Sequence, residues 1–214
     1  MESLTRMKKR IVEVAFQYRL SHLGSYFSCL PVVDEIYSKK SKDDIFILSC
    51  GHAALALYVA LEKYEGSDAE ELFRNHGGHP HRKERDGIHC STGSLGMGLP
   101  FAVGKAIANK DRKVHCLISD GECAEGSIWE SLKFIYENNI SNIEVYVSVN
   151  GYAAYDAVDT DYLIRRLKSF LPQINIRHTK VNEFSFLKGL NAHYHIMDEE
   201  DYEAALRELD EKTV

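Results

Sequence analysis

The residues of this sequence whose types and spacing could do chemistry are an Asp-Gly-Glu tripeptide, Asp120 to Glu122, and an amide, Asn150. The tripeptide follows the apolar run 114–118, and Asn150 follows the apolar run 143–149. If both runs are parallel strands, their carboxyl ends meet at one edge of a sheet, which is where open α/β sheets bind ligands. Carboxylate and amide oxygens at such an edge suit Mg²⁺ or Ca²⁺ carrying a diphosphate. An Asp-Gly pair is also a common tight turn, so this interpretation depends on the rest of the chain.

The elements that must position these side chains follow from the apolar periodicity. Short apolar runs predict strands at 45–48, 114–118 and 143–149, with shorter β-like runs at 174–176 and 194–196. Apolar residues at three- and four-residue spacing predict a helix within 4–18 and another with Ile128, Leu132 and Ile135 on one face. Further helices are predicted from near Pro31 and within 53–64, 68–74, 101–109, 161–170 and 199–209. This alternation favours an α/β fold, with a mainly parallel sheet and helices on both faces. We find no internal repeat or linker, and we predict a single domain over residues 1–214.

Two loops are predicted between these elements. The first, Ser21 to Ser25, ends the opening helix with a glycine stop, and the next helix begins near Pro31, because proline is favoured in a first turn. The second covers residues 75–100 and is too rich in Gly, His and charge to belong to the core. Long loops inside a compact domain are usually functional.

Composition excludes several classes of protein. The 214 residues are 44% hydrophobic and 27% charged, which is ordinary for a globular domain. A net charge of −6 with scattered Lys and Arg gives no footprint for nucleic acid. No apolar run approaches the about 18 residues that a membrane span needs. Five cysteines without a CxxC pair indicate a reducing compartment, so we expect a cytoplasmic protein.

Four segments occur in an order that resembles the diphosphate-binding domain of transketolase, and most closely the free-standing N-terminal subunits of split transketolases. They are HLG at 22–24, SCGH at 49–52, STGSLGMG at 91–98, and the DGE tripeptide with its later Asn. The interval from Asp120 to Asn150, 150 − 120 = 30 positions, is similar to that of transketolases. The resemblance covers roughly residues 10–158, and it implies binding of thiamine diphosphate with Mg²⁺ or Ca²⁺.

The resemblance also implies roles for individual residues in holding the cofactor. Asp120 and Asn150 would ligate the metal through side-chain oxygens, and the Tyr152 carbonyl would add a backbone ligand. The residues implied to contact or line the cofactor are His52, Gly93, Leu95, Gly121, Glu122 and Asn150.

Three further residues are implied to act on the substrate or at an interface. His22 and His79 would bind donor-sugar hydroxyls and assist proton transfer, which an imidazole with a pKa of about 6.5 can do near neutral pH. Glu125 would lie at the subunit interface and link two cofactor sites.

Each of these residues also has a simpler interpretation. His22 could be a capping or surface histidine, His52 could cap a helix, and Glu125 could be a solvated carboxylate in a first helical turn. The histidines of the long loop could suggest zinc, but they lack thiolate partners and the usual ligand spacings.

The sequence departs from the family pattern in two ways that matter. Ser119 and Val149 replace a Gly before the metal Asp and an Asp before the metal Asn. After residues 199–209 the chain stops at Val214, whereas the family continues with a strand and a loop that supplies a further histidine. We find no matching segment and expect a C-terminally shortened domain. Either the partner supplies this part, or the sugar chemistry differs, or the cofactor binds less tightly.

The family's second, pyrimidine-binding domain is absent from these 214 residues. The resemblance therefore implies a transferase subunit, inactive alone, that works with a separately encoded pyrimidine-domain subunit in an α₂β₂ assembly. The implied reaction moves a two-carbon ketol unit from a ketose, often phosphorylated, to an aldose.

Two alternatives stay open. The same cofactor could serve a reaction like that of deoxyxylulose-phosphate synthase or of a 2-oxoacid decarboxylase. A non-catalytic protein could instead keep the fold for interaction or regulation, which the C-terminal end and Val149 would suit.

Overall fold

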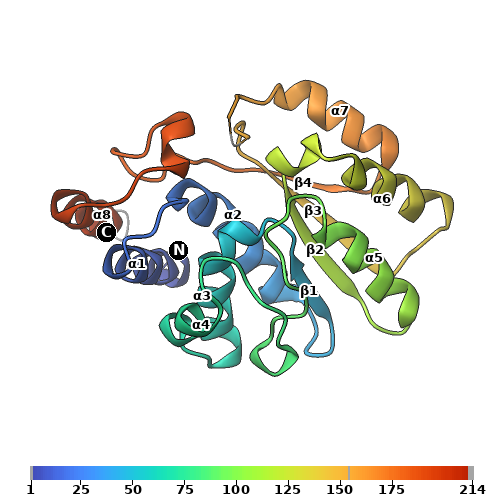
Figure 1. Ribbon diagram of the computed structural model, residues 1–214, viewed down its shortest axis with the longest axis horizontal. Helices are drawn as coiled ribbons and strands as arrows, with labels where there is room; N and C mark the ends of the chain where they lie inside the picture. The colour runs from blue at the N-terminus through green and yellow to red at the C-terminus, as the bar shows by residue number, and fades with distance from the viewer. Residues whose placement is uncertain (1, 154, 212–214) are drawn as a thin grey trace.

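Four parallel strands form one sheet in the order β1-β2-β3-β4 in the computed structural model, which describes residues 2–153 and 155–211 (Figure 1). The strands are β1 (Ile45–Leu48), β2 (Val114–Ser119), β3 (Ile143–Val149) and β4 (Asn175–His178). All residues of β1 and β2 are buried, as expected of parallel strands covered on both faces. The predicted strands 45–48 and 143–149 are confirmed with these bounds, and the predicted 114–118 extends by one residue.

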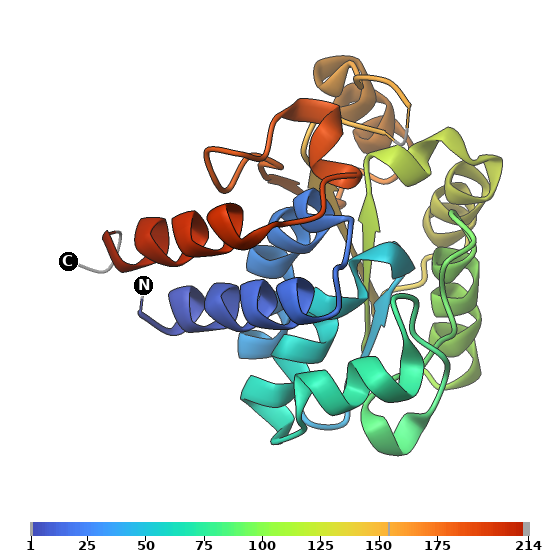
Figure 2. The same cartoon turned by 60° about the vertical axis from the view of Figure 1, so that its left-hand side comes forward.

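Helices cover both faces of this sheet, which confirms the predicted fold class (Figures 1 and 2). Leu48 and Leu117 pack in one core with the helices α1 (Glu2–Gln17), α2 (Leu23–Lys39), α3 (Ala54–Glu65), α4 (Ala69–His76) and α8 (Glu199–Glu211). Ile47 and Ile118 face the opposite core with α5 (Gly98–Ala108), α6 (Gly126–Glu137) and α7 (Thr160–Phe170). The connections also contain four short 3₁₀ helices: η1 (Gly51–Ala53), η2 (Glu84–Asp86), η3 (Gly121–Ala124) and η4 (Gly189–His193).

The second helix begins earlier than predicted. It starts at Leu23 and contains Pro31, so most of the predicted loop 21–25 is helical, and the prediction of a start near Pro31 is wrong. Proline removes one helical hydrogen bond, and its cost is usually about 3 kcal/mol. Here Pro31 is exposed, while nearly all of the remaining residues from Leu23 to Tyr37 are buried. Burial of that long apolar face outweighs the lost bond.

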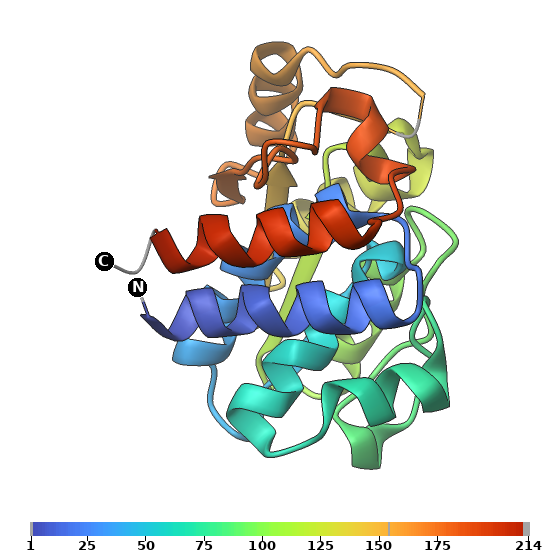
Figure 3. The same ribbon diagram turned by 90° about the vertical axis from the view of Figure 1, so that its left-hand side faces the viewer.

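The segment after β4 also differs from the prediction. Residues 194–196, predicted as a β-like run, form no strand, because the amides of Tyr194 and His195 both donate to the Asn191 carbonyl in a local turn. From there the chain enters α8, which packs along α1 (Figure 3). The Phe16 and Tyr202 rings stack at a centroid distance of 4.4 Å between these two helices.

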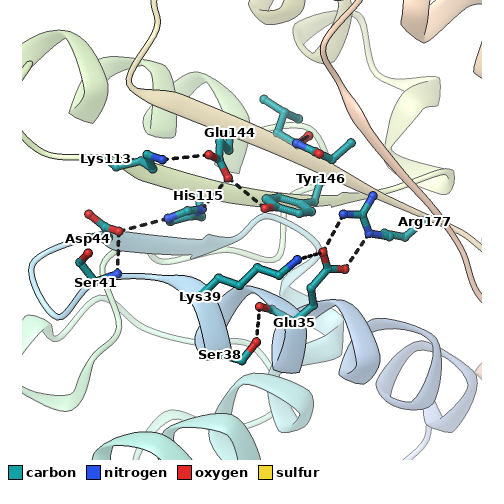
Figure 4. Close-up of polar contacts among 12 residues, drawn as sticks. Glu35, Ser38, Lys39, Ser41, Asp44, Lys113, His115, Glu144, Tyr146 and Arg177 are labelled. Carbon is teal, nitrogen blue, oxygen red and sulfur yellow. Dashed lines mark hydrogen bonds and ion pairs between the residues drawn. The ribbon is translucent and has the colours of Figure 1, made fainter.

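A network of charged side chains joins α2 to the sheet (Figure 4). Arg177 of β4 donates through Nε and Nη2 to the two carboxylate oxygens of Glu35 on α2, both at 2.7 Å. The Arg177 guanidinium also lies 5.4 Å from the ring centroid of Tyr146, whose hydroxyl donates to Glu144 at 2.9 Å. The Arg177 guanidinium holds the pKa of Glu35 at about 2, well below its usual range, with a smaller contribution from Lys39.

Within residues 2–153 and 155–211, no helix combines the length and apolar character that crossing a membrane requires.

The Glu35–Arg177 pair makes a prediction about stability and pH. Glu35→Gln is expected to lower the free energy of unfolding by about 1 kcal/mol at neutral pH, because Arg177 loses a charged partner that is mostly shielded from water. Since the folded pKa of Glu35 lies below its ordinary value of 4.5, the contribution is complete above that pH and is lost as the pH falls toward about 2. Urea denaturation of both proteins at neutral and acidic pH measures the difference.

The matched control is Glu203→Gln, because Glu203 and Arg207 are 4.0 Å apart with side chains 72% and 67% exposed. This variant should match the wild type at every pH. A Glu35→Gln difference that persists undiminished in acid would contradict the assignment to ionised Glu35.

Candidate functional site

A cavity of about 210 Å³ lies where the connections after β1, β2 and β3 leave the sheet. It is lined by residues from the start of α2, η1, the long loop after α4, η3, the segment after β3, and the end of η4. The predicted site residues that line it are His22, His52, His79, Gly93, Leu95, Asp120, Gly121, Asn150 and Tyr152. Glu122 and Glu125 are not among the lining residues. These residues come from five distant stretches of the sequence, which meet at the predicted edge of the sheet.

Asp120 is a buried carboxylate with unusual surroundings. Its Oδ2 accepts hydrogen bonds from the amides of Asn150 at 2.8 Å and Gly151 at 2.7 Å, and its Oδ1 accepts from the Gly121 amide at 3.0 Å. No Lys, Arg or His among the described residues pairs with it, so burial raises its pKa to about 6 despite these donors. Such a carboxylate lacks a positively charged partner, which a bound cation would supply.

Asn150 and Tyr152 complete an oxygen-rich corner. Asn150 Oδ1 accepts the Tyr152 amide at 2.9 Å, which orients the side-chain amide and leaves one acceptor position of that oxygen. A Cβ placed on Gly121 would lie 3.7 Å from the Tyr152 carbonyl oxygen, so this carbonyl lies beside the Asp120-Gly121 peptide. The donor set is carboxylate, amide and carbonyl oxygen, which is the set that Mg²⁺ and Ca²⁺ prefer.

Glu122 has a different position from the one that the sequence suggests. Its side chain is fully buried beneath the cavity. Oε1 accepts from the Ser49 hydroxyl at 2.7 Å and the Gly96 amide at 2.9 Å, and Oε2 accepts from the Ser119 amide at 3.1 Å. Glu122 therefore joins the segment after β1, the long loop and the end of β2, and it does not line the cavity. Ser119, which replaces the expected glycine, has no positive φ, so the substitution costs no backbone strain.

Three imidazole rings gather in the same cavity. The rings of His22 and His52 lie 5.6 Å apart, and the ring of His193 lies 6.4 Å and 6.2 Å from them. Burial lowers the pKa of all three, and the neighbouring imidazoles lower it further, to about 3 for His52. These rings are therefore neutral at pH 7 until a negative charge enters the cavity.

His193 is a cavity-lining histidine that the sequence interpretation missed. It lies at the end of η4, in a part of the chain where we found no match to the histidine-bearing loop of the family. Its carbonyl accepts the His22 amide at 2.8 Å, and its ring contributes to the cavity. A His in the stretch Asn-Ala-His-Tyr-His was the available signal, but the fold decides which of the two histidines turns inward. His195 instead contacts Asp201 at 2.6 Å.

Close backbone contact joins the loop before α3 to the long loop. A Cβ on Gly51 would come within 2.5–2.7 Å of the Thr92 carbonyl and the Gly93 amide, so only glycine fits there. Gly93 has φ of 150° and lies against the ring of His79, which is exposed at the rim of the cavity. These contacts fix His52 and His79 relative to each other. Glu125 lies outside the cavity with its side chain in solvent.

Comparison with known proteins identifies the domain. Residues 33–151 match the family model described as the thiamine diphosphate binding domain of transketolase. A protein of Phocaeicola vulgatus, named as one of the subunits of apulose-4-phosphate transketolase, is 29% identical over 96% of this chain and 92% of its own length. The protein of the same name from Actinobacillus succinogenes is 31% identical over 70% of this chain and 63% of its own.

Longer transketolases match over a smaller share of their length. The human transketolase is 34% identical over 50% of this chain, which is 19% of the human protein. The crystal structure of Campylobacter jejuni transketolase superposes with a TM-score of 0.69 at 20% identity, over 98% of this chain and 43% of that one. The transketolase of Leishmania mexicana gives the same score at 16% identity, over 99% and 45%. These two structures support the fold.

The contact at Gly51 predicts that a single methyl group disturbs the site. Gly51→Ala is expected to destabilise the protein by about 2 kcal/mol, because the new Cβ meets backbone atoms that cannot rotate away. Gly104→Ala is the matched control, since a Cβ there meets nothing within 4 Å in the exposed face of α5. That variant should gain about 0.5–1 kcal/mol from better helix propensity. Urea denaturation of both variants measures the changes, and equal stability of the two would refute the argument.

Proposed function

Since this chain belongs to the transketolase family through its thiamine diphosphate binding domain, we propose that it is the cofactor-binding subunit of a split transketolase-like transferase. The observation that carries the proposal is the meeting of two unlike surfaces in one cavity. An oxygen-rich corner around Asp120 needs a cation, and a cluster of neutral imidazoles around His52 can donate to an anion. A divalent metal bound to a diphosphate satisfies both.

The residues present fit thiamine diphosphate held through Mg²⁺ or Ca²⁺. Asp120, Asn150 and the Tyr152 carbonyl would hold the metal, because each keeps an oxygen at the same corner of the cavity. His52 and His193 would contact the diphosphate. When bound, the cofactor supplies the carbanion chemistry that protein side chains cannot.

The backbone of the site provides the remaining contacts of the cofactor. Gly93 and Leu95 line the cavity and would pack against the bound molecule. Gly121 lies in the oxygen-rich corner and lines the cavity without a side chain that would fill it. In this structure its amide donates to Asp120. Glu122 would serve the cofactor indirectly, by holding the loops that carry these residues.

The reaction that we propose is transfer of a two-carbon ketol unit from a ketose to an aldose. His22 and His79 would bind hydroxyls of the sugar and move protons, since both rings line the cavity and His79 lies at its exposed rim. Two relatives are named for apulose 4-phosphate, which supports a sugar phosphate as substrate.

Activity should require a second chain. The two relatives named for apulose 4-phosphate, which match this chain over most of its length, are each named as one of several subunits, and that name implies a separate partner. We propose that this partner carries the pyrimidine-binding domain.

An α₂β₂ assembly would place Glu125, which is exposed, at an interface that links two cofactor sites. We propose that residues 1–214 form one cofactor-binding domain. Its five cysteines are all free and buried, which suits the cytoplasm.

The metal assignment makes a prediction about binding. Asp120→Asn should weaken thiamine diphosphate binding in the presence of Mg²⁺ by roughly a hundredfold or more, because the neutral amide removes the charge that holds the metal. Calorimetric titration of the chain, alone and with its partner, measures the affinity with Mg²⁺ and after chelation. Asp111→Asn, at an exposed position away from the cavity, is the control. Unchanged affinity in Asp120→Asn would rule out the metal role of this residue.

The assignment of His22 makes a prediction about catalysis. His22→Ala should reduce turnover of the assembled enzyme by roughly 10²-fold or more while leaving cofactor affinity nearly intact, since a positioned proton-transfer group contributes on that scale. Turnover is measured with a panel of ketose phosphates, with the chain alone as the inactive reference. His81→Ala is the control, because His81 is exposed and does not line the cavity. Full turnover in His22→Ala would remove His22 from the site.

A further inference from the structure

The side chain of Ser25 lies buried in the first turn of α2, with an exposed fraction of 2%. Its hydroxyl oxygen is 2.9 Å from Nδ1 of His193, which comes from η4, 193 − 25 = 168 positions along the chain. The two segments are packed tightly here, since a Cβ on Gly24 would lie 2.9 Å from that of Ala192. The serine is therefore held against the imidazole by the backbone on both sides.

The Ser25 side chain also lines the cavity, and its exposure of 2% leaves the hydroxyl little contact with solvent. Among the described residues, the only hydrogen bond of this hydroxyl is the one to His193. A buried hydroxyl that accepted from Nδ1–H would leave its own hydrogen without an acceptor, which costs about 1–3 kcal/mol. The lower-energy arrangement has the Ser25 hydroxyl donating to Nδ1. In a neutral imidazole, the hydrogen then resides on Nε2.

The Nε2 atom of His193 is the ring nitrogen that reaches the cavity. It makes no hydrogen bond to any described residue, and it does not belong to the buried nitrogens that lack a partner. It is therefore accessible, and His193 is one of the residues that line the cavity. An Nε2–H at this point is a donor directed at whatever anion enters.

We propose that Ser25 is a positioning residue, whose hydroxyl donates to Nδ1 of His193 and holds that ring in the tautomer with Nε2–H facing the cavity. The inference rests on the proposed function for the identity of the anion, which would be the cofactor diphosphate. A phosphate-bearing ligand needs a hydrogen-bond donor, and the opposite tautomer would present a lone pair to it. Ser25 thus decides whether His193 attracts or repels the anion.

The chain offers a matched pair for the test. Ser21 lies just before α2, and its hydroxyl is 3.0 Å from Nδ1 of His22, the neighbouring ring of the same cluster. Ser21→Ala and Ser25→Ala remove the same group from the same segment but act on different rings. A general loosening of this segment would disturb both rings in both variants, whereas positioning predicts that each variant affects its own ring.

The experiment is ¹⁵N NMR of the full chain with labelled histidine, with the His193 signals assigned through His193→Gln. In the wild type we expect His193 to be neutral at pH 7 with the hydrogen on Nε2. Ser25→Ala should convert that signal to a mixture of tautomers and leave His22 unchanged, while Ser21→Ala should leave His193 unchanged. Hydrogen on Nδ1 in the wild type, or the same His193 signals in Ser25→Ala, would overturn the proposal. The tautomer of His193 in the wild type tests the proposal even if Ser25→Ala does not fold.

A second readout separates this inference from the proposed function. Titration with thiamine diphosphate and Mg²⁺ should show binding to the wild type and roughly fivefold to tenfold weaker binding to Ser25→Ala, the effect of one lost hydrogen bond. No binding to the wild type would refute the proposed function, while the tautomer measurement would still test the contact. Equal affinity of the two proteins would overturn the positioning role.

Discussion

The buried carboxylate of Glu122 joins three parts of the site, namely the segment after β1, the long loop between α4 and α5, and the end of β2. It accepts a hydroxyl hydrogen from Ser49 after β1 and amide hydrogens from Gly96 and Ser119, and it has no exposed surface. A buried carboxylate is stable only when its oxygens are fully bonded, so these donors cannot move apart without leaving a charge unpaired. His52, Leu95 and Asp120 each lie within three residues of one of them. The geometry of the cavity therefore depends on this internal carboxylate, which explains why an acidic residue two positions after Asp120 does not line the cavity.

The two surfaces of the cavity have opposite electrostatic requirements. Burial raises the pKa of Asp120, because only amide dipoles stabilise its negative charge. Burial lowers the pKa of His22, His52 and His193, because a positive charge there would be poorly solvated and close to other imidazoles. A cation alone would satisfy the first surface and an anion alone the second. A metal diphosphate satisfies both at once, so each half of such a ligand should favour binding of the other. The protein holds this arrangement with hydrogen bonds that do not involve the ligand.

Local patterns in the sequence predict the elements well where burial and periodicity agree. The runs 45–48 and 143–149 are strands with those bounds, because continuous apolar residues between turns leave few alternatives. The meeting of Asp120 and Asn150 was also predictable, because β2 and β3 are neighbouring parallel strands whose carboxyl ends lie at one edge. The start of α2 was not predictable, since local preference places Pro31 in a first turn. Only burial against the rest of the protein makes a helix that contains Pro31 favourable. The side chain of Glu122 could not be placed from a motif either, because its partners come from two other loops.

His193 shows most clearly what a local pattern lacks. Its segment has no periodicity, and its position depends on contacts with the first turn of α2. His22 adopts φ of 66°, which is uncommon for a residue other than glycine, and in that conformation its amide donates to the His193 carbonyl. Gly24 then allows η4 to approach, and α8 packs along α1 behind it. The backbone strain at His22 is therefore offset by contacts that exist only when the C-terminal segment is docked. The position of His193 in the histidine cluster therefore depends on the docking of η4 against the start of α2.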